Sequence, residues 1–205
     1  MLSAEPVFTI PASLHAAERY SKIIIASAPS ASSTTGTLSY YRQGSDGAWE
    51  TVLSVPCYFG WDGVGAGSEY SSCSPVGIYT FIKLFGSAPD PGCIMGYTQL
   101  DGDEYWCGEQ YYNQWVDSTM DHSQCSLSAD EHLLEMGPEY EYCAAFSYNM
   151  SCTPGRGSAF FLHVTANIPT AGCVSVSRDA MVTLMRIIDG RTCFIIDTEA
   201  NIASY

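Results

Sequence analysis

Basic residues are scarce in this chain. Among its 205 residues, 8 are Lys or Arg and 22 are Asp or Glu, so the formal net charge is −14 at pH 7. Proteins that bind nucleic acid place Lys and Arg against the phosphates, so this balance argues against a nucleic-acid partner. An apolar run of about 18 residues is also missing, which excludes a membrane-spanning helix. The stretch 1–10 lacks the basic start and apolar core of a signal peptide, so a leader for export would lie outside this sequence.

Two site signatures are absent as well. The glycine-rich residues 60–68 are not followed by Gly-Lys-Ser or Gly-Lys-Thr, so they do not have the phosphate-binding pattern. None of the cysteine spacings is Cys-x-x-Cys, which argues against a zinc ribbon. The sequence therefore gives no reason to expect a metal or a cofactor.

Cysteine, in contrast, is abundant, with nine residues. So many free thiols are unusual in a cytosolic enzyme, whereas disulfides persist in exported proteins, so we expect a secreted protein. Because the count is odd, we predict four disulfides and one remaining thiol, Cys173. A glycine-rich loop joins Cys57 to Cys73 and favours that pair. A strand-like segment separates Cys143 from Cys152 by more than the Cα limit of about 7 Å for a bridge, which disfavours the second pair.

Strand-like segments dominate the chain, which predicts a mainly β fold with about two helices. The length suits a single domain spanning residues 1–205, in which residues 1–35 form an N-terminal strand and loop region, and we expect a monomer. The segments expected to form strands are 23–27, 38–42, 48–61 (as a pair), 74–86 (after a turn), 141–150, 158–164 and 192–198.

Two helices and one long loop complete this prediction. A short helix over 128–136 would be capped by Ser128, and a longer one over 178–189 would be capped by Ser177 and ended by Gly190. The polar and aromatic residues 101–127 are expected to form a long ordered loop, and such loops are often functional. The aromatic side chains that could line a cleft are Trp106, Tyr111, Tyr112, Trp115, Tyr140 and Tyr148, although ordinary packing is the better explanation for any single one of them.

The pair His163 and Cys173 carries the strongest chemical signal. His163 ends an apolar strand, and Cys173 follows Gly172 ten residues later. A thiol needs a base to become a nucleophilic thiolate, and histidine is the natural base near neutral pH. The amides of Gly172 and Cys173 could form an oxyanion hole, and the helix starting near Arg178 could lower the thiol pKa. His163 alone fits a core histidine and Cys173 alone a buried thiol, but their spacing favours acyl transfer. The other histidines, His15, His122 and His132, lack such a setting.

The segments GSAFFLHV and TAGCVSV together resemble the signature of the L,D-transpeptidases of bacterial cell walls, the YkuD-like catalytic domain. That signature is a His, a spacer, Ser or Thr, a variable residue, Gly and Cys, and its members correspond here to His163, Thr170, Gly172 and Cys173. SPVGIYTF at 74–81 resembles the family's TPxGxF segment.

Two more segments support this resemblance, which runs from about residue 36 to the C-terminus. YNQWV at 112–116 and FSYN at 146–149 resemble substrate-cleft segments, which makes Tyr112, Asn113, Tyr148 and Asn149 substrate-cleft candidates. One feature departs from the family pattern, because Val174 and Ser175 follow Cys173 where many members have Ile-Arg. The arginines that could substitute are Arg156, Arg178 and Arg186.

The resemblance implies a β-sandwich or mixed-sheet catalytic domain with a helix directly after the nucleophile. It also implies a location in the cell wall or periplasm and peptidoglycan stem peptides as partners. Cys173 would attack the L,D-peptide bond of a tetrapeptide stem and release D-alanine, and an amine of a second stem would resolve the thioester into a 3-3 cross-link. His163 would act as base and then as acid. Carbapenems would acylate Cys173.

Three alternatives differ in class. Water as the acceptor would make the protein an L,D-carboxypeptidase. A secreted, disulfide-stabilised module that binds glycan or peptide would use the same aromatic residues without catalysis. A papain-like protease is disfavoured, because its nucleophile precedes its histidine by a long segment, whereas here His163 comes first and lies close to Cys173.

Overall fold

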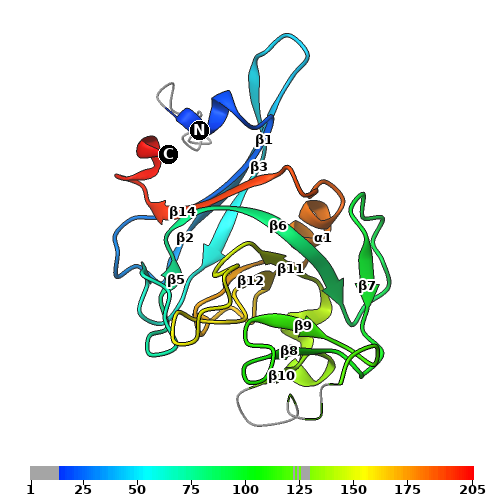
Figure 1. Ribbon diagram of the computed structural model, residues 1–205. Coiled ribbons are helices and arrows are strands. Elements are labelled where there is room, and N and C mark those ends of the chain that lie inside the picture. The colour runs from blue at the N-terminus through cyan, green and yellow to red at the C-terminus, as the bar shows by residue number, and fades with distance from the viewer. Residues whose placement is uncertain (1–13, 122, 124, 126–129) are drawn as a thin grey trace.

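The computed structural model describes residues 14–121, 123, 125 and 130–205 and shows a mainly β protein (Figure 1). Its strands are β1 (Lys22–Ala28), β2 (Thr35–Gln43), β3 (Trp49–Tyr58), β4 (Val64–Gly65), β5 (Ser74–Pro75), β6 (Gly77–Gly86), β7 (Tyr97–Gln99), β8 (Tyr105–Cys107), β9 (Gln114–Val116), β10 (Glu131–His132), β11 (Cys143–Phe146), β12 (Phe161–Val164), β13 (Val174–Val176) and β14 (Cys193–Thr198). The helices are α1 (Arg178–Met185) and the 3-10 turns η1 (His15–Glu18), η2 (Leu133–Met136), η3 (Pro138–Glu141) and η4 (Ile202–Ser204).

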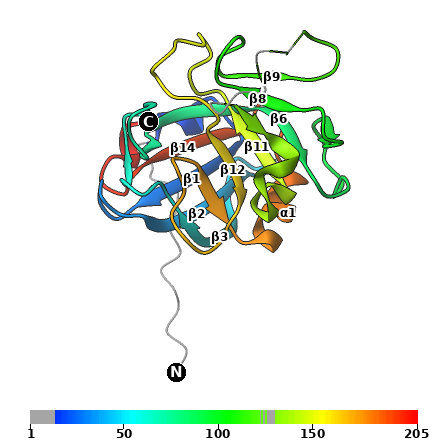
Figure 2. The same cartoon turned by 90° about the horizontal axis from the view of Figure 1, so that it is seen from below.

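The main sheet closes on itself. Its strand order is β11-β12-β13-β3-β2-β1-β14-β6-β7, and β11 also pairs with β6, so that β7 alone lies outside the ring (Figures 1 and 2). The parallel pairs β1–β14, β12–β13 and β6–β7 make it a mixed sheet, as predicted. The observed sheet is more specific than the predicted sandwich or mixed sheet, because the β11–β6 pairing closes it into a barrel and so leaves β11 without a free edge.

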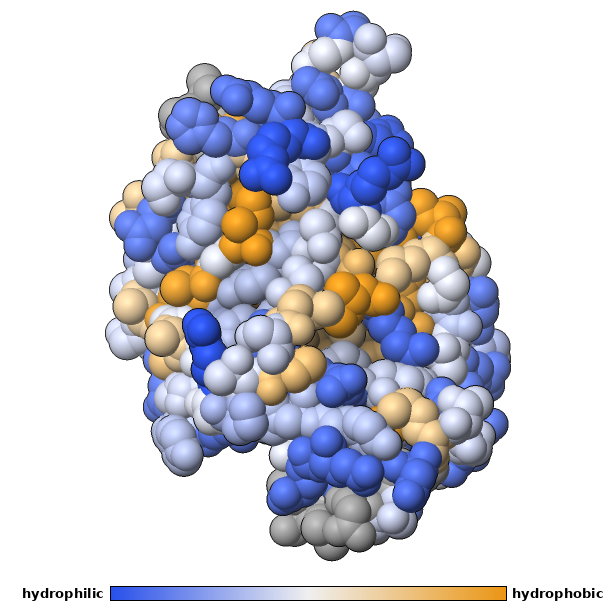
Figure 3. Space-filling view, in the orientation of Figure 1, coloured by the Kyte–Doolittle hydropathy of each residue, from blue (hydrophilic) through white to orange (hydrophobic). Residues whose placement is uncertain are grey.

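Apolar runs explain most of these strands. The residues of β1, β11, β12 and β14 are almost all buried, which fits strands covered on both faces. The segment 48–61, expected to form two strands, forms the single strand β3, because it pairs along its whole length with β2. The outward side chains Ile78 and Ile82 of β6 are exposed, and hydrophobic side chains on this face lie in separate spots (Figure 3).

The helix α1 begins where predicted, with the Ser177 hydroxyl accepting a hydrogen bond from the Ala180 amide. It ends at Met185 and not at Gly190, because Arg186 is already its C-cap. The prediction that a helix directly follows the nucleophile is also wrong. The strand β13 lies between Cys173 and α1, because buried β-branched residues there pair with both β12 and β3.

In a second, three-stranded sheet, which we call the small sheet, β8 and β9 come from the segment expected to be a loop and β10 comes from the segment expected to be a helix (Figure 1). The prediction of a helix over 128–136 is wrong for residues 130–136, the part of that segment that the structure describes. Glu131 and His132 pair with β8, and the following residues form the 3-10 turn η2, held by the fully buried Leu133. The predicted cap Ser128 and the histidine His122 lie outside the described residues.

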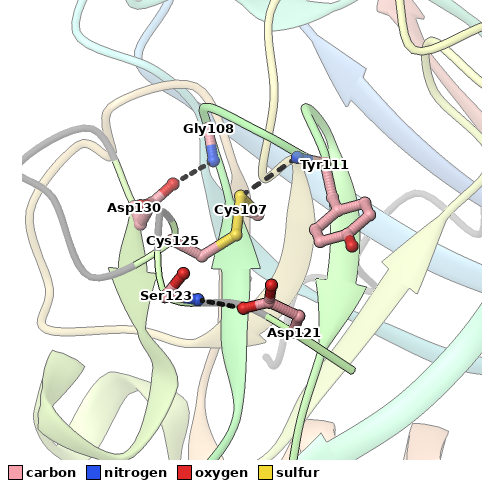
Figure 4. Close-up of a disulfide and its surroundings, with 7 residues drawn as sticks. All are labelled: Cys107, Gly108, Tyr111, Asp121, Ser123, Cys125 and Asp130. Atoms are coloured by element: carbon pink, nitrogen blue, oxygen red, sulfur yellow. Dashed lines mark hydrogen bonds between the residues drawn. A yellow bond between two sulfur atoms is a disulfide. The ribbon is translucent and has the colours of Figure 1, made fainter. Parts of the chain in front are cut away.

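The small sheet carries a disulfide between Cys107 and Cys125, with Cα atoms 5.3 Å apart (Figure 4). The prediction of four disulfides is wrong, because the other seven cysteines are free thiols, Cys173 among them. The favoured Cys57–Cys73 pair does not form, because Cys57 is buried in the main core while Cys73 donates to the Asp62 carbonyl. No helix in the described part of the chain is long and apolar enough to cross a membrane.

Candidate active site

Cys173 and His163 line one cavity of about 660 Å³. His163 lies on β12, and Cys173 immediately precedes β13, the parallel neighbour of β12. In this ladder His163 is paired with Ser175, so the chain after the nucleophile runs beside the strand that carries the histidine. The predicted pair thus shares one site.

The Cys173 thiol is held by the backbone of the preceding loop. Its Sγ donates to the Ala159 carbonyl at 3.3 Å and accepts a hydrogen bond from the Phe161 amide at 3.3 Å. Burial, and to a smaller extent the charge of Glu131, raises the pKa of the thiol to about 12, although the Phe161 N–H acts to lower it. The thiol is therefore neutral at rest, and the helix-assisted lowering of its pKa expected from the sequence is wrong, since β13 stands between Cys173 and the start of α1.

The His163 ring is oriented by its own strand. Its Nδ1 lies 2.8 Å from the Val164 carbonyl oxygen, so Nδ1 carries the proton and Nε2 remains available as an acceptor. Burial lowers the pKa of the imidazole, partly offset by the Val164 carbonyl and by Glu139. A neutral imidazole with a free Nε2 is the form that a general base requires.

Two hydroxyls fix the backbone of the nucleophile. Thr170 Oγ1 donates to the Cys173 carbonyl at 2.6 Å, and Ser74 Oγ donates to the same oxygen at 2.8 Å. Both residues belong to the segments that resemble the family signature, and these bonds give them a shared positioning role. The Gly60 amide in turn donates to Ser74 Oγ at 2.9 Å, which orients that hydroxyl.

The glycine before the nucleophile is required by the space around it. Gly172 has a φ of 141°, and a Cβ there would lie 2.5 Å from the Phe160 ring. Its amide donates to Thr170 Oγ1 at 3.1 Å. The predicted oxyanion hole therefore needs correction, because the Gly172 amide already has a partner and the Cys173 amide remains as the candidate donor.

None of the four substrate-cleft candidates, Tyr112, Asn113, Tyr148 and Asn149, lines the cavity. Instead, they bind residues that line the cavity or their neighbours in the chain. Asn113 Oδ1 accepts hydrogen bonds from the Trp106 indole and the Ala159 amide, while its Nδ2 donates to the carbonyls of Tyr148 and Asn149. Because Ala159 has a φ of 57° and its carbonyl accepts the Cys173 thiol, Asn113 holds the turn that orients the nucleophile.

The other three candidates have similar structural roles, and the Tyr148 hydroxyl donates to the Gly67 carbonyl at 3.0 Å. The Tyr112 hydroxyl donates to Glu69 and accepts from the Gly157 amide, and Asn149 Nδ2 donates to the Gly157 carbonyl at 3.0 Å. The Tyr112 bond ties the small sheet to the loop before β12, and the Asn149 bond closes that loop on itself. Of the six aromatic side chains named from the sequence, Tyr140 alone lines the cavity.

The cavity is also lined by four carboxylates that the sequence analysis did not single out: Asp62, Glu69, Glu131 and Glu139. Glu131 on β10 accepts a hydrogen bond from the Tyr140 hydroxyl at 2.6 Å, and burial raises its pKa to about 7. The sequence pattern placed Glu131 in the first turn of a helix, where an acidic residue needs no further explanation.

No arginine substitutes for the one that many L,D-transpeptidases carry after the nucleophile, as far as the described residues show. Arg178 is paired with Glu141, and Arg186 Nε donates to the Pro91 carbonyl at 2.8 Å. Neither they nor Arg156 line the cavity. The group Cys107, Cys125 and Asp130 brings possible metal ligands together, but its two sulfurs are bonded to each other (Figure 4).

No protein-family model matches the chain, and no curated protein matches it. Among solved structures, the chain is similar to the helical cell shape determining protein Pgp2 from Campylobacter jejuni, with a TM-score of 0.47 and 13% sequence identity. The match covers 88% of this chain and 49% of that one, so the chain spans about half the length of this structure. A likeness at this level assigns no family.

Proposed function

We propose that the protein is a cysteine acyltransferase that acts on peptidoglycan stem peptides as an L,D-transpeptidase. The observation that carries the proposal is a buried thiol and a neutral histidine with a free Nε2 on one cavity wall, with the nucleophile's carbonyl held by Thr170 and Ser74. Those residues are the ones that resemble the YkuD-like signature. An exported protein fits this role, and the Cys107–Cys125 disulfide is compatible with that location.

In the free protein the Cys173 thiol is neutral, so the proposed reaction begins with the transfer of its proton. Because the Cys173 thiol has a pKa of about 12, it must lose its proton as substrate binds. We propose that the thiol turns from the Ala159 carbonyl toward His163, that Nε2 takes the proton, and that Sγ attacks the carbonyl carbon of the L,D bond. The carbon–nitrogen bond then breaks, and the leaving amine takes the proton from His163.

The second half of the reaction reverses these transfers. An amine of a second stem attacks the thioester carbon, His163 accepts the amine proton, and the Cys173 sulfur leaves and is protonated again. Water in place of the amine would give the L,D-carboxypeptidase reaction, and both outcomes use the same thioester. A glycan- or peptide-binding module would need none of this geometry.

Mass spectrometry of products formed from a purified disaccharide-tetrapeptide tests the proposal. We expect release of D-alanine, together with a 3-3 linked dimer or, for the carboxypeptidase, a tripeptide. His163→Gln should abolish the release of D-alanine and the formation of the dimer or tripeptide. It should also slow iodoacetamide labelling of Cys173 near neutral pH, because the thiol loses its base. His132→Gln is the matched control, since His132 lies on the small sheet and does not line the cavity. Identical labelling rates for the wild type and His163→Gln between pH 6 and 8 would refute the pairing.

A further inference from the structure

Basic side chains, scarce in the chain as a whole, gather at one pocket. This pocket has a volume of about 440 Å³ and is lined by Arg19, Tyr20, Ser21, Lys22, Asp189 and Arg191. It therefore holds three of the eight Lys and Arg residues of the chain, and none of its residues lines the cavity of Cys173. Three cations against one carboxylate give the lining a formal charge of +2, whereas the whole chain carries −14.

The parallel pairing of β1 and β14 builds this pocket. Ile23 of β1 is paired with Cys193 of β14, and both strands run in the same direction, so the residues that precede them meet at one edge of the closed sheet. Ser21 and Arg191 each lie two residues before this pair. Side chains from opposite ends of the sequence are thus brought to one place.

The ion pair between Lys22 and Asp189 fixes the pocket. Lys22 Nζ donates to Asp189 Oδ2 at 2.7 Å and to the Ile187 carbonyl at 3.2 Å. Asp189 Oδ1 accepts hydrogen bonds from the Arg191 amide at 2.9 Å and from the Thr192 hydroxyl at 3.2 Å. Burial acts to raise the pKa of Asp189, but these partners outweigh it and hold the pKa below its ordinary value. The single carboxylate of the pocket therefore stays charged and neutralises Lys22.

The guanidinium groups of Arg19 and Arg191 have no carboxylate partner among the described residues. Both residues are exposed, and the Arg19 guanidinium lies 5.7 Å from the centre of the Tyr20 ring. Glu18, the acidic neighbour of Arg19 in the chain, lies 3.8 Å from His15 and does not line the pocket. A guanidinium offers five N–H donors in a planar fork, which suits the oxygens of an oxyanion. The pocket thus presents two uncompensated positive charges.

We propose that this pocket binds a phosphate monoester, with Arg19 and Arg191 holding its oxygens. Such a group carries a charge of about −1.5 to −2 near pH 7 and three acceptor oxygens, which matches two guanidinium groups in charge and in donors. A carboxylate has one charge and two oxygens, so it would leave one guanidinium unmatched. The hydroxyls of Tyr20 and Ser21 on the lining supply further donors. This site is independent of the reaction proposed at Cys173.

The pH dependence of binding tests the match in charge. Glycerol 1-phosphate gains its second negative charge near pH 6, whereas inorganic sulfate remains a dianion between about pH 5 and pH 8. NMR titration of the full chain, followed at the amides of residues 19–22 and 189–192, gives both affinities. Their ratio cancels any titration of the protein itself. We expect the affinity for glycerol 1-phosphate relative to sulfate to rise at least about fivefold between pH 5 and pH 8. A constant ratio, or no binding of glycerol 1-phosphate at the higher pH, would overturn the proposal.

Substitution of the two arginines tests the location of the site. Arg19→Gln and Arg191→Gln should each weaken binding of glycerol 1-phosphate about fivefold, because each removes one nearby charge. Arg191→Lys should recover only part of the affinity, since an ammonium lacks the planar fork. Arg156→Gln is the matched control, because Arg156 is also exposed, carries the same charge and does not line the pocket. Equal weakening in all three glutamine variants would overturn the proposal, since the effect would then report net charge alone. If a pocket variant fails to fold, the pH dependence of the wild type still decides.

Vesicles distinguish a lipid headgroup from a soluble ester as the source of the phosphate. The protein is sedimented with vesicles of equimolar phosphatidylcholine and phosphatidic acid, and with vesicles of phosphatidylcholine alone. Retention that requires phosphatidic acid, and that Arg191→Gln loses while Arg156→Gln keeps, supports the site and assigns it to a headgroup. Binding of glycerol 1-phosphate without retention supports it and assigns it to a soluble ester. Retention that Arg191→Gln leaves unchanged, without binding of glycerol 1-phosphate, would overturn the proposal.

Discussion

The closed sheet and the small sheet contribute different things to the candidate site. The closed sheet supplies His163 and Ser175 from adjacent buried strands, whose backbones are paired on both sides, and Cys173 from the position just before β13. The small sheet supplies Glu131 and the supporting Asn113, and it is held by a disulfide and by hydrogen bonds of its loops. The groups that we propose to react therefore belong to the closed sheet, whereas Glu131, one of the four carboxylates that line the cavity, belongs to the small sheet.

The two sheets therefore have different roles in the candidate site. Strand pairing fixes the backbone of His163 and of the residues after Cys173, while Asn113, next to β9, holds the Ala159 turn that accepts the thiol, so the geometry of the site depends on both parts. The small sheet also contributes one of the cavity's carboxylates, Glu131. The following substitutions separate the two contributions, from the largest expected effect to the smallest.

Cys173→Ala should lower turnover at least ~10⁴-fold while leaving the thermal midpoint within a few degrees of the wild type, because the nucleophile is lost and the cavity is only slightly enlarged. Product analysis by mass spectrometry and a thermal melt measure the two effects. Cys143→Ala is the matched control, since Cys143 is another buried thiol, opposite His163 on β11. Residual dimer formation at the wild-type rate in Cys173→Ala would show that the nucleophile is a different residue.

Removing the disulfide with Cys107→Ser and Cys125→Ser should lower the free energy of unfolding by about 3 kcal/mol, because the bridge closes a loop with a sequence separation of 18. Hydrogen exchange should show the loss in β8, β9 and β10 and leave β1, β2 and β14 protected. The reduced wild type provides the comparison. Equal loss of protection in both sheets would contradict the division between them.

Thr170→Val should cost about 1 to 2 kcal/mol of transition-state stabilisation, because the Cys173 carbonyl then keeps the Ser74 hydroxyl alone. Ser74→Ala should have a similar effect on kcat/KM. The double variant should lose more than the sum of the single losses, since both hydroxyls serve one oxygen. Thr165→Val on the same loop is the control. Strict additivity would indicate that the two hydroxyls do not act on the same atom.

Glu131→Gln should stabilise the protein at pH 8 by about 1 to 2 kcal/mol and change little at pH 4. Burial raises the pKa of Glu131 in the folded protein to about 7, above its ordinary value of 4.5, so the native state holds this proton more tightly than the unfolded state. The wild type is therefore most stabilised by this group below pH 4.5, and loses that contribution as the pH rises through 7. Chemical denaturation at the two pH values measures it, with Glu135→Gln as the control.

The sequence alone predicted most strands of the closed sheet and that His163 and Cys173 would share one site. Apolar, β-branched runs such as residues 23–27 and 192–198 leave few alternatives to a buried strand, and the interval between His163 and Cys173 is short enough for one loop to bring them to neighbouring strands. The Ser177 cap was predictable because it acts within one helical turn. These features depend on residues close together in the chain.

Tertiary structure decided the rest, because it depends on contacts between distant segments. Closure of the sheet results from β6 meeting β11, about sixty residues apart, and no local pattern encodes that pairing. Glu131 resembles an acidic residue of a helix start until β10 pairs with β8 and brings it to the cavity. The number of cysteines suggested four bridges, but bonding requires Cα atoms within about 7 Å, and the fold leaves seven cysteines as free thiols, on the strands β3, β11 and β14 and in the loops between strands.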